Sequence, residues 1–183
     1  MAVADRVKEA IDKMNLGDPV NALIQVCLAV DATAKREYPK NKVGERTKKF
    51  LRNNQVFLTA FVKLAVGGDI LLQLKDKNGE PETKKLEEVL YKLVRCALVH
   101  EASISDRIII TPDPCFGLSK DGKFILSRGL IWGMINAVIG SPANSRERAP
   151  DNYWISIGGQ RISLNELWGK KDIILQLAGV NVG

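Results

Sequence analysis

Histidine and cysteine are scarce in this chain, which has one histidine and three cysteines among its 183 residues. A single histidine excludes the metal sites that one chain builds from several histidines. The cysteines, Cys27, Cys96 and Cys115, are odd in number and form no C-x-x-C pair, so we expect neither a disulfide framework nor a zinc site. A metal site made of carboxylates stays open, but no spacing in the sequence indicates one, and we expect a protein that uses no cofactor.

Long apolar runs and glycine-rich motifs are missing as well. No apolar run approaches the roughly 18 residues of a membrane span, and the charged, amphipathic N-terminus differs from a signal peptide. We expect a cytoplasmic protein that makes no membrane contact. Neither a P-loop, nor a G-x-G-x-x-G motif, nor a G-x-S-x-G nucleophile elbow occurs, which excludes the enzyme classes that depend on these motifs.

The first hundred residues instead carry apolar residues at the spacings of three and four that are typical of amphipathic helices. Asp18 followed by Pro19 is a strong helix start signal, and Asp31 continues the apolar stripe of the helix that begins there. We predict helices over about residues 3–14, 19–38, 44–66 and 82–101. The third is expected to bend or divide near Arg52–Asn54.

The pattern changes after about residue 104. The β-branched run 107–111 predicts a strand, and Asp121-Gly122 predicts a tight turn between short strands. A helix is expected over 126–139 and a hairpin over 153–164. Ser163-x-x-Glu166 resembles a capping box that opens a last helix ending near Gly179. The fold class is therefore mainly α, with a helical bundle at 1–104 and an α/β extension at 105–183 that packs on it and contains short antiparallel strands.

Positive charge is concentrated between Lys35 and Arg52, where eight basic residues face two acidic ones. Such a cluster attracts phosphate backbones, although a solvated loop and helix face explains it equally well. If it binds RNA, the expected contacts are five residues: Arg36, Arg46, Lys48, Lys49 and Arg52.

The most chemically suggestive residues are Arg95 and His100, near the end of the helix expected over 82–101. An arginine fork binds phosphate oxygens, histidine transfers protons near neutral pH, and RNA supplies its own 2′-hydroxyl nucleophile. At about 100° per residue, the two side chains project about 140° apart on a straight helix. Either the helix unwinds before His100, or a complete site forms from two chains. A structural role remains open for both, with Arg95 pairing with Asp31 and His100 meeting the terminal carbonyls.

The segment Leu90–Glu101 resembles the signature of the HEPN superfamily, an arginine followed four to six residues later by histidine near the end of a bundle helix. The helix that carries Asp31 also resembles an upstream HEPN helix with an inward acidic residue. The resemblance covers about residues 1–104 and implies a bundle that often dimerises through this motif. Active members are metal-independent endoribonucleases of toxin, defence or RNA-processing systems, while inactive members bind RNA or proteins.

Carried onto this chain, the resemblance implies that His100 transfers protons, Arg95 binds phosphate and Asp31 is an orienting acid. The first hypothesis is therefore a homodimeric HEPN-like endoribonuclease whose partners are RNA and an antitoxin or effector protein. The second is an inactive HEPN-like module that binds RNA or protein, which Cys96 favours because catalytic members usually carry Asn or Asp after the arginine. A third is an assembly protein that uses residues 107–183 as its interface.

Overall fold

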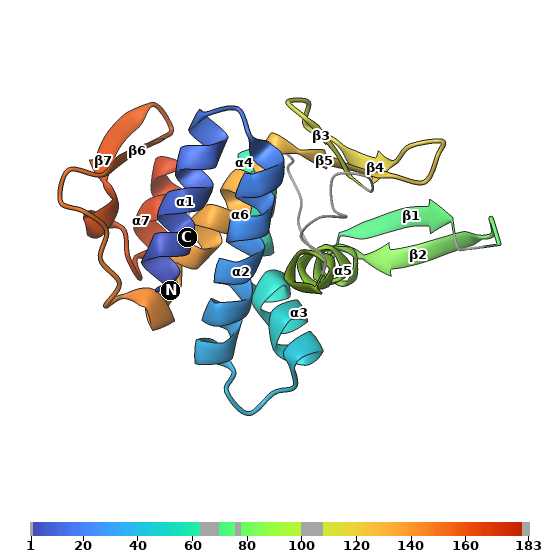
Figure 1. Cartoon of the computed structure of the whole chain (residues 1–183), viewed down its shortest axis with the longest axis horizontal. Coiled ribbons are helices and arrows are strands. Elements are labelled where there is room, and N and C mark those ends of the chain that lie inside the picture. Colours follow the sequence, from blue (N-terminus) through green and yellow to red (C-terminus); the bar gives the residue numbers. More distant parts are fainter. Residues whose placement is uncertain (1, 63–69, 76–77, 100–107, 181–183) are drawn as a thin grey trace.

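The computed structural model describes residues 2–62, 70–75, 78–99 and 108–180, and only the backbone of residues 74, 75, 93–99 and 118. This part of the chain is mainly helical, as predicted, with seven α-helices and three small sheets. The helices form the centre of the molecule, and two of the sheets lie at the opposite end from the third (Figure 1). Among the described residues, no helix combines the length and apolarity needed to cross a membrane.

The first two helices, α1 (Val3–Asn15) and α2 (Pro19–Glu37), pack side by side as a hairpin. Gly17, with a φ of 75°, makes the turn that ends α1. The Asp18 carboxylate accepts a hydrogen bond from the Asn21 N–H and caps α2, and Pro19 is its first residue. Both predicted helices and the predicted start signal are confirmed.

The next helices are α3 (Val43–Asn53) and α4 (Gln55–Val62), divided at Asn54 as the sequence predicted. The helix expected over 82–101 begins later, as α5 (Leu86–Val99), because residues 81–85 form a strand. This strand, β2 (Pro81–Lys85), pairs antiparallel with β1 (Leu71–Lys75), for which the sequence predicted no element. The prediction was wrong at this end because residues 82–85 contain no apolar residue, so the helical stripe starts only at Leu86.

The second sheet contains β3 (Ile108–Thr111), β4 (Phe116–Leu118) and β5 (Phe124–Ser127) in the order β3-β5-β4. The predicted turn at Asp121-Gly122 joins β4 and β5, which are antiparallel. However, β3 and β5 are parallel, so the expectation of antiparallel strands holds for only part of this sheet. Strand pairing depends on contacts between distant residues, which local patterns do not show.

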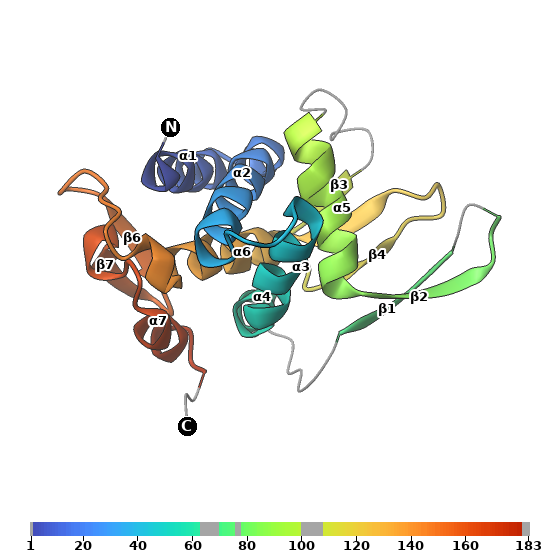
Figure 2. The same ribbon diagram turned by 90° about the horizontal axis from the view of Figure 1, so that it is seen from below.

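The helix that follows, α6 (Arg128–Gly140), lies at the centre of the molecule (Figure 2). It packs against α4, α2, α7 (Lys171–Leu177) and α1. Nearly every residue from Leu130 to Gly140 is buried, including Asn136, so α6 buries all of its faces instead of one. Elements from both halves of the chain therefore meet on this helix.

The C-terminal part comprises the 3₁₀ turn η2 (Pro142–Asn144), the predicted hairpin of β6 (Trp154–Ile157) and β7 (Gln160–Ser163), and α7. The expected capping box is wrong: Ser163 makes no capping hydrogen bond, and only the 3₁₀ turn η3 (Leu164–Glu166) follows it. Gly169, with a φ of 75°, separates that turn from α7.

The two ranges expected as bundle and extension share one hydrophobic core. One continuous cluster of buried side chains runs from Val3 in α1 to Leu175 in α7. It includes members of α2, α4, α5, α6, β3 and β5. Residues 105–183 thus contribute to the centre of the fold as well as to its periphery.

Candidate functional site

The helix that carries Arg95 packs against both the helix that carries Asp31 and the helix that carries half of the basic cluster. Figure 2 shows α5 beside α3, and α5 contacts both α2 and α3. The backbone of Arg95 lies in the last two turns of α5, which ends at Val99. The Arg95 side chain and all of His100 lie outside the described residues.

Asp31 faces α3, where its carboxylate meets Arg46. The distance from Arg46 Nη2 to Asp31 Oδ1 is 3.3 Å, and the two side chains are 12% and 23% exposed. Arg46 Nε is buried and has no hydrogen-bond partner within the described part of the chain. The acid that the resemblance assigns to the Arg95 site is therefore engaged by a residue predicted to bind RNA.

A second ion pair fixes the start of α5. The carboxylate of Glu87, whose side chain is fully buried, accepts hydrogen bonds from Arg52 Nε at 2.8 Å and from Gln55 Nε2 at 3.2 Å. Arg52 and Gln55 lie on either side of the break between α3 and α4. The Arg52 side chain is 52% exposed, so it joins this buried acid to the basic surface.

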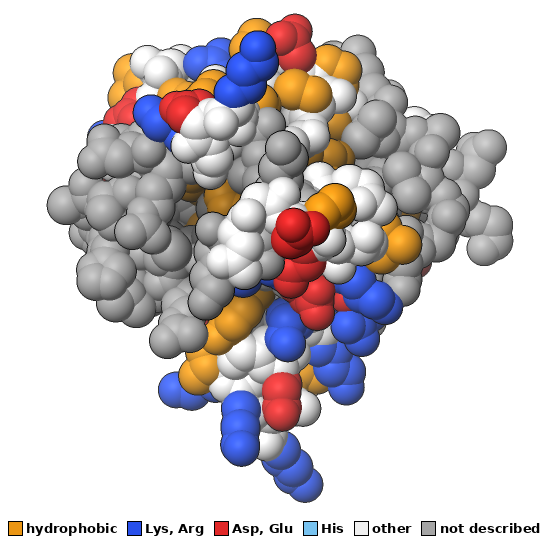
Figure 3. All heavy atoms as spheres, turned by 90° about the vertical axis from the view of Figure 1, so that its right-hand side faces the viewer, with side chains coloured by type: hydrophobic (Ala, Val, Ile, Leu, Met, Phe, Trp, Pro, Cys, Tyr) orange, Lys and Arg blue, Asp and Glu red, His pale blue; other side chains and the backbone are white. Residues whose placement is uncertain are grey.

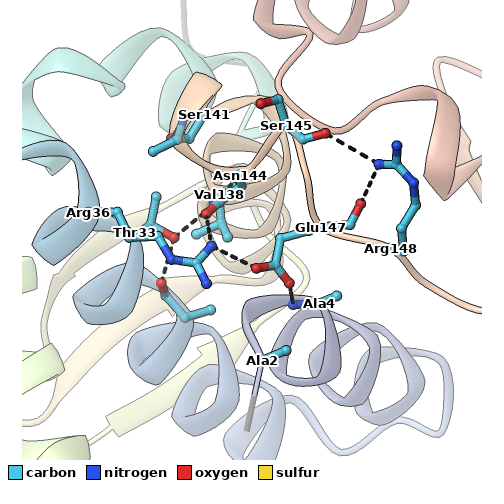
Figure 4. A network of polar contacts seen from close by, with 12 residues as sticks. Ala2, Ala4, Thr33, Arg36, Val138, Ser141, Asn144, Ser145, Glu147 and Arg148 are labelled. Carbon is cyan, nitrogen blue, oxygen red and sulfur yellow. Dashed lines mark hydrogen bonds and ion pairs between the residues drawn. The ribbon is translucent and has the colours of Figure 1, made fainter.

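Arg36 belongs to a network that joins the C-terminal part of α2 to the segment after α6 (Figure 4). Its Nη1 donates to Asn144 Oδ1 at 2.8 Å and to Glu147 Oε1 at 2.7 Å. The other Glu147 oxygen accepts from the Ala4 N–H at the start of α1, and the buried Asn144 amide donates to Thr33 Oγ1 and to the Val138 carbonyl. Arg36 thus has a structural role in joining α2 to the segment after α6 and, through Glu147, to the start of α1.

The lysines of the cluster are less constrained than its arginines. Lys49 is exposed and lies over the Tyr38 ring, with its Nζ 4.6 Å from the ring centroid. Burial raises the pKa of the Tyr38 hydroxyl, which accepts a hydrogen bond from Asn53. Lys40, Lys42 and Lys48 make no ion pair with any described residue. Figure 3 shows Lys and Arg side chains gathered toward the lower end of the face on which the α2–α3 connection lies.

The structure thus brings together only some of the predicted site residues. Arg46 meets Asp31, whereas Arg36 and Arg52 hold separate ion pairs and Lys48 and Lys49 stay on the surface. Sequence patterns did not single out Glu87 or Glu147, because their partners lie 35 and 111 residues away. Within the described ranges, no three His, Cys, Asp or Glu residues form a group that could hold a metal ion.

Comparison with known proteins gives a family but no activity. The chain is 25% identical over 170 residues to the uncharacterized protein Rv1289 of Mycobacterium tuberculosis and equally to the uncharacterized protein Mb1320 of Mycobacterium bovis. Each alignment covers 87% of this chain and 80% of the relative. No solved structure matches it. The model of the Rv1289 family matches residues 2–181, and the chain therefore belongs to the Rv1289 family.

Proposed function

We propose that this protein is a HEPN-like, metal-independent endoribonuclease that acts as a cytoplasmic homodimer. The observation that carries the proposal is the packing of α5 across α2 and α3. This packing brings the helix of Arg95 against the helix of Asp31 and against α3, on which Lys49 and the N-cap residue Lys42 are exposed. A positive surface on a helix that α5 contacts supports binding of an RNA backbone.

In the proposed reaction, the RNA 2′-oxygen attacks the adjacent phosphorus and the bond from phosphorus to the 5′-oxygen breaks. His100 accepts the proton of the 2′-hydroxyl, and His100 of a second copy donates a proton to the leaving 5′-oxygen. Arg95 neutralises the charge that develops on the phosphate oxygens. The products are a 2′,3′-cyclic phosphate and a free 5′-hydroxyl, and no metal ion takes part. A toxin, defence or RNA-processing role, with an antitoxin or effector as protein partner, would follow from this activity.

The test is cleavage of end-labelled RNA in excess EDTA by the wild-type protein and by His100→Ala. Removing a general acid–base group lowers the rate by about 10²–10⁴-fold. Arg95→Ala should lower it as well, and the wild-type products should carry 2′,3′-cyclic phosphates. Arg146→Ala is the matched control, because Arg146 is exposed on the segment after α6. Its rate should equal that of the wild type.

A substrate control separates this chemistry from contamination. A strand of the same sequence made of DNA lacks the 2′-hydroxyl and should stay intact. Equal RNA cleavage by the wild type and His100→Ala, or loss of cleavage in EDTA, would contradict the proposal.

A second candidate function is an inactive HEPN-like module that binds RNA or protein. It is favoured by the ion pairs of Asp31, Arg36 and Arg52, which assign these residues structural partners. In that case no cleavage occurs, and His100→Ala lowers the melting temperature only. Substitution of Lys40, Lys42 and Lys48 by alanine should then weaken RNA binding, measured by fluorescence anisotropy.

A further inference from the structure

A hollow of about 390 Å³ lies between the C-terminal end of α1, the N-terminal half of α6 and the β6–β7 hairpin. Its volume falls within the range of about 300–1,000 Å³ that is usual for small-molecule sites. Figures 1 and 2 place α1 and the hairpin toward one end of the molecule and α5 toward the other. The hollow is therefore separate from the helix that carries Arg95, and what it binds does not depend on the proposed nuclease activity.

Five of the nine residues that line the hollow are apolar or aromatic, and the other four are polar or charged. Ile11 and Ile155 are buried beneath it, and Trp132, Tyr153 and Trp154 line it. Trp154 is 46% exposed, which is unusual for so large an aromatic side chain. A ring exposed to this extent is suited to stacking against a planar group, and the Arg161 guanidinium lies over one face of it.

The Tyr153 hydroxyl forms hydrogen bonds with α1. It donates to Asp12 Oδ1 at 2.7 Å and lies 3.2 Å from the Lys8 carbonyl. Burial, together with the Asp12 carboxylate, raises the pKa of Tyr153, so the phenol stays neutral. Tyr153 therefore offers an aromatic surface to the hollow, with its polar atom occupied elsewhere.

The charge that lines the hollow is positive and comes from Arg161. Its guanidinium lies 5.4 Å from the centroid of the Trp154 ring and makes no ion pair with any described residue. No aspartate or glutamate lines the hollow. Asn15, Asn152 and Ser156 also line it, and within the described part of the chain their side chains make no hydrogen bonds. The arrangement thus combines aromatic surface, one available cation and several available polar groups.

We propose that this hollow binds a nucleoside monophosphate. The base stacks on the Trp154 side of the site, since base–aromatic stacking is a main source of affinity for unpaired nucleotides. The planar guanidinium of Arg161 pairs with the phosphate. Asn15, Asn152 and Ser156 hydrogen-bond the polar edges of the base and ribose.

The experiment is isothermal titration of the full chain with AMP, alongside adenosine, which lacks the charge, and inorganic phosphate, which lacks the ring. AMP should bind saturably, and adenosine and phosphate should each bind at least about tenfold more weakly, a difference of about 1.4 kcal/mol. Arg161→Gln and Trp154→Ala should each weaken AMP binding by at least about tenfold. Circular dichroism would verify that both variants keep the fold, which is expected because both side chains are exposed.

Arg146→Gln is the matched control, because it removes the same charge from an exposed position that does not line the hollow. It should bind AMP as the wild type does. The proposal is overturned if AMP shows no saturable binding with a Kd of about 1 mM or tighter. It is also overturned if adenosine binds as tightly as AMP, or if Arg161→Gln binds AMP unchanged. None of these outcomes bears on RNA cleavage, which is tested at Arg95 and His100.

Discussion

The Glu87 carboxylate is buried. Glutamate is rarely found in the interior of a protein unless it is paired. Glu87 lies in the first turn of α5, where a negative charge also interacts favourably with the helix dipole. Its two described partners, Arg52 and Gln55, come from the helices on either side of the break at Asn54. The Glu87 side chain thereby fixes the start of α5, the helix that carries Arg95, against both α3 and α4.

Glu87→Ala should lower the free energy of unfolding by about 2–3 kcal/mol, because it removes charge-assisted hydrogen bonds and leaves Gln55 without its hydrogen-bond acceptor. The loss should fall below the 3–5 kcal/mol of a fully buried ion pair, because Arg52 is half-exposed and gains water when the acid is removed. Urea denaturation would measure it. Glu166→Ala, at an exposed position, is the control and should change stability by less than about 0.5 kcal/mol. An equally small change for Glu87→Ala would show that the pair contributes no stability.

At the scale of elements, the crossing of α4 and α6 depends on glycines. A methyl group at Gly133 would lie 2.8 Å from both the Leu58 Cα and the Phe57 carbonyl oxygen. At Gly129 it would lie 2.2 Å from the Phe61 carbonyl oxygen. These positions are four residues apart and face the same helix, so the two backbones approach as closely as glycine permits.

Gly133→Ala should therefore destabilise the protein, although alanine is favoured over glycine inside a helix by about 1 kcal/mol. The clash is with backbone, which cannot rotate away, and overpacking of this kind costs about 1–3 kcal/mol. We expect a lower melting temperature in calorimetry. The control is Gly117→Ala in β4, where a methyl group would meet nothing within 4 Å. A Gly133→Ala variant as stable as the wild type would mean that α4 and α6 do not cross so closely.

Elements whose signals are local could be predicted from the sequence. Asp18-Pro19 marked the start of α2, and the hairpin expected over 153–164 is the β6–β7 hairpin. Elements that depend on distant partners could not: β2 is polar and forms because β1 pairs with it, and β3 joins β5 in parallel. For α6, the pattern indicated the helix but not its burial on all sides, because that burial comes from packing against α1, α2, α4 and α7.

The candidate site could also be predicted only in part. The sequence placed Asp31 on the inner side of α2, and the structure finds it partly buried against α3. Its partner Arg46, expected at an RNA surface, could not be assigned to it, because the angle between α2 and α3 depends on packing. The hollow beside Trp154 could not be predicted either, since its lining comes from α1, α6 and the β6–β7 hairpin, three regions that are far apart in the sequence.

At the scale of the whole molecule, the position of α6 determines what can fold alone. The range 1–104 was expected to form a bundle on which 105–183 packs. In the structure, α6 lies between the α1–α2 hairpin and α4 (Figure 2). It contributes six large buried side chains to the core: Leu130, Ile131, Met134, Ile135, Val138 and Ile139.

A fragment of residues 1–104 should therefore fail to fold by itself. Each large apolar side chain contributes about 1.5–3 kcal/mol when buried, so losing six of them, and exposing Phe57 and Leu58 on α4, removes as much as the whole stability of a typical domain, about 5–15 kcal/mol. We expect no cooperative thermal transition for the fragment by circular dichroism, and a cooperative one for the full chain. Mixing the fragment with residues 105–183 is the control, because association should restore α6 and part of the transition. A cooperative transition of the fragment alone, near that of the full chain, would show that 1–104 is an independent domain and that α6 is dispensable to it.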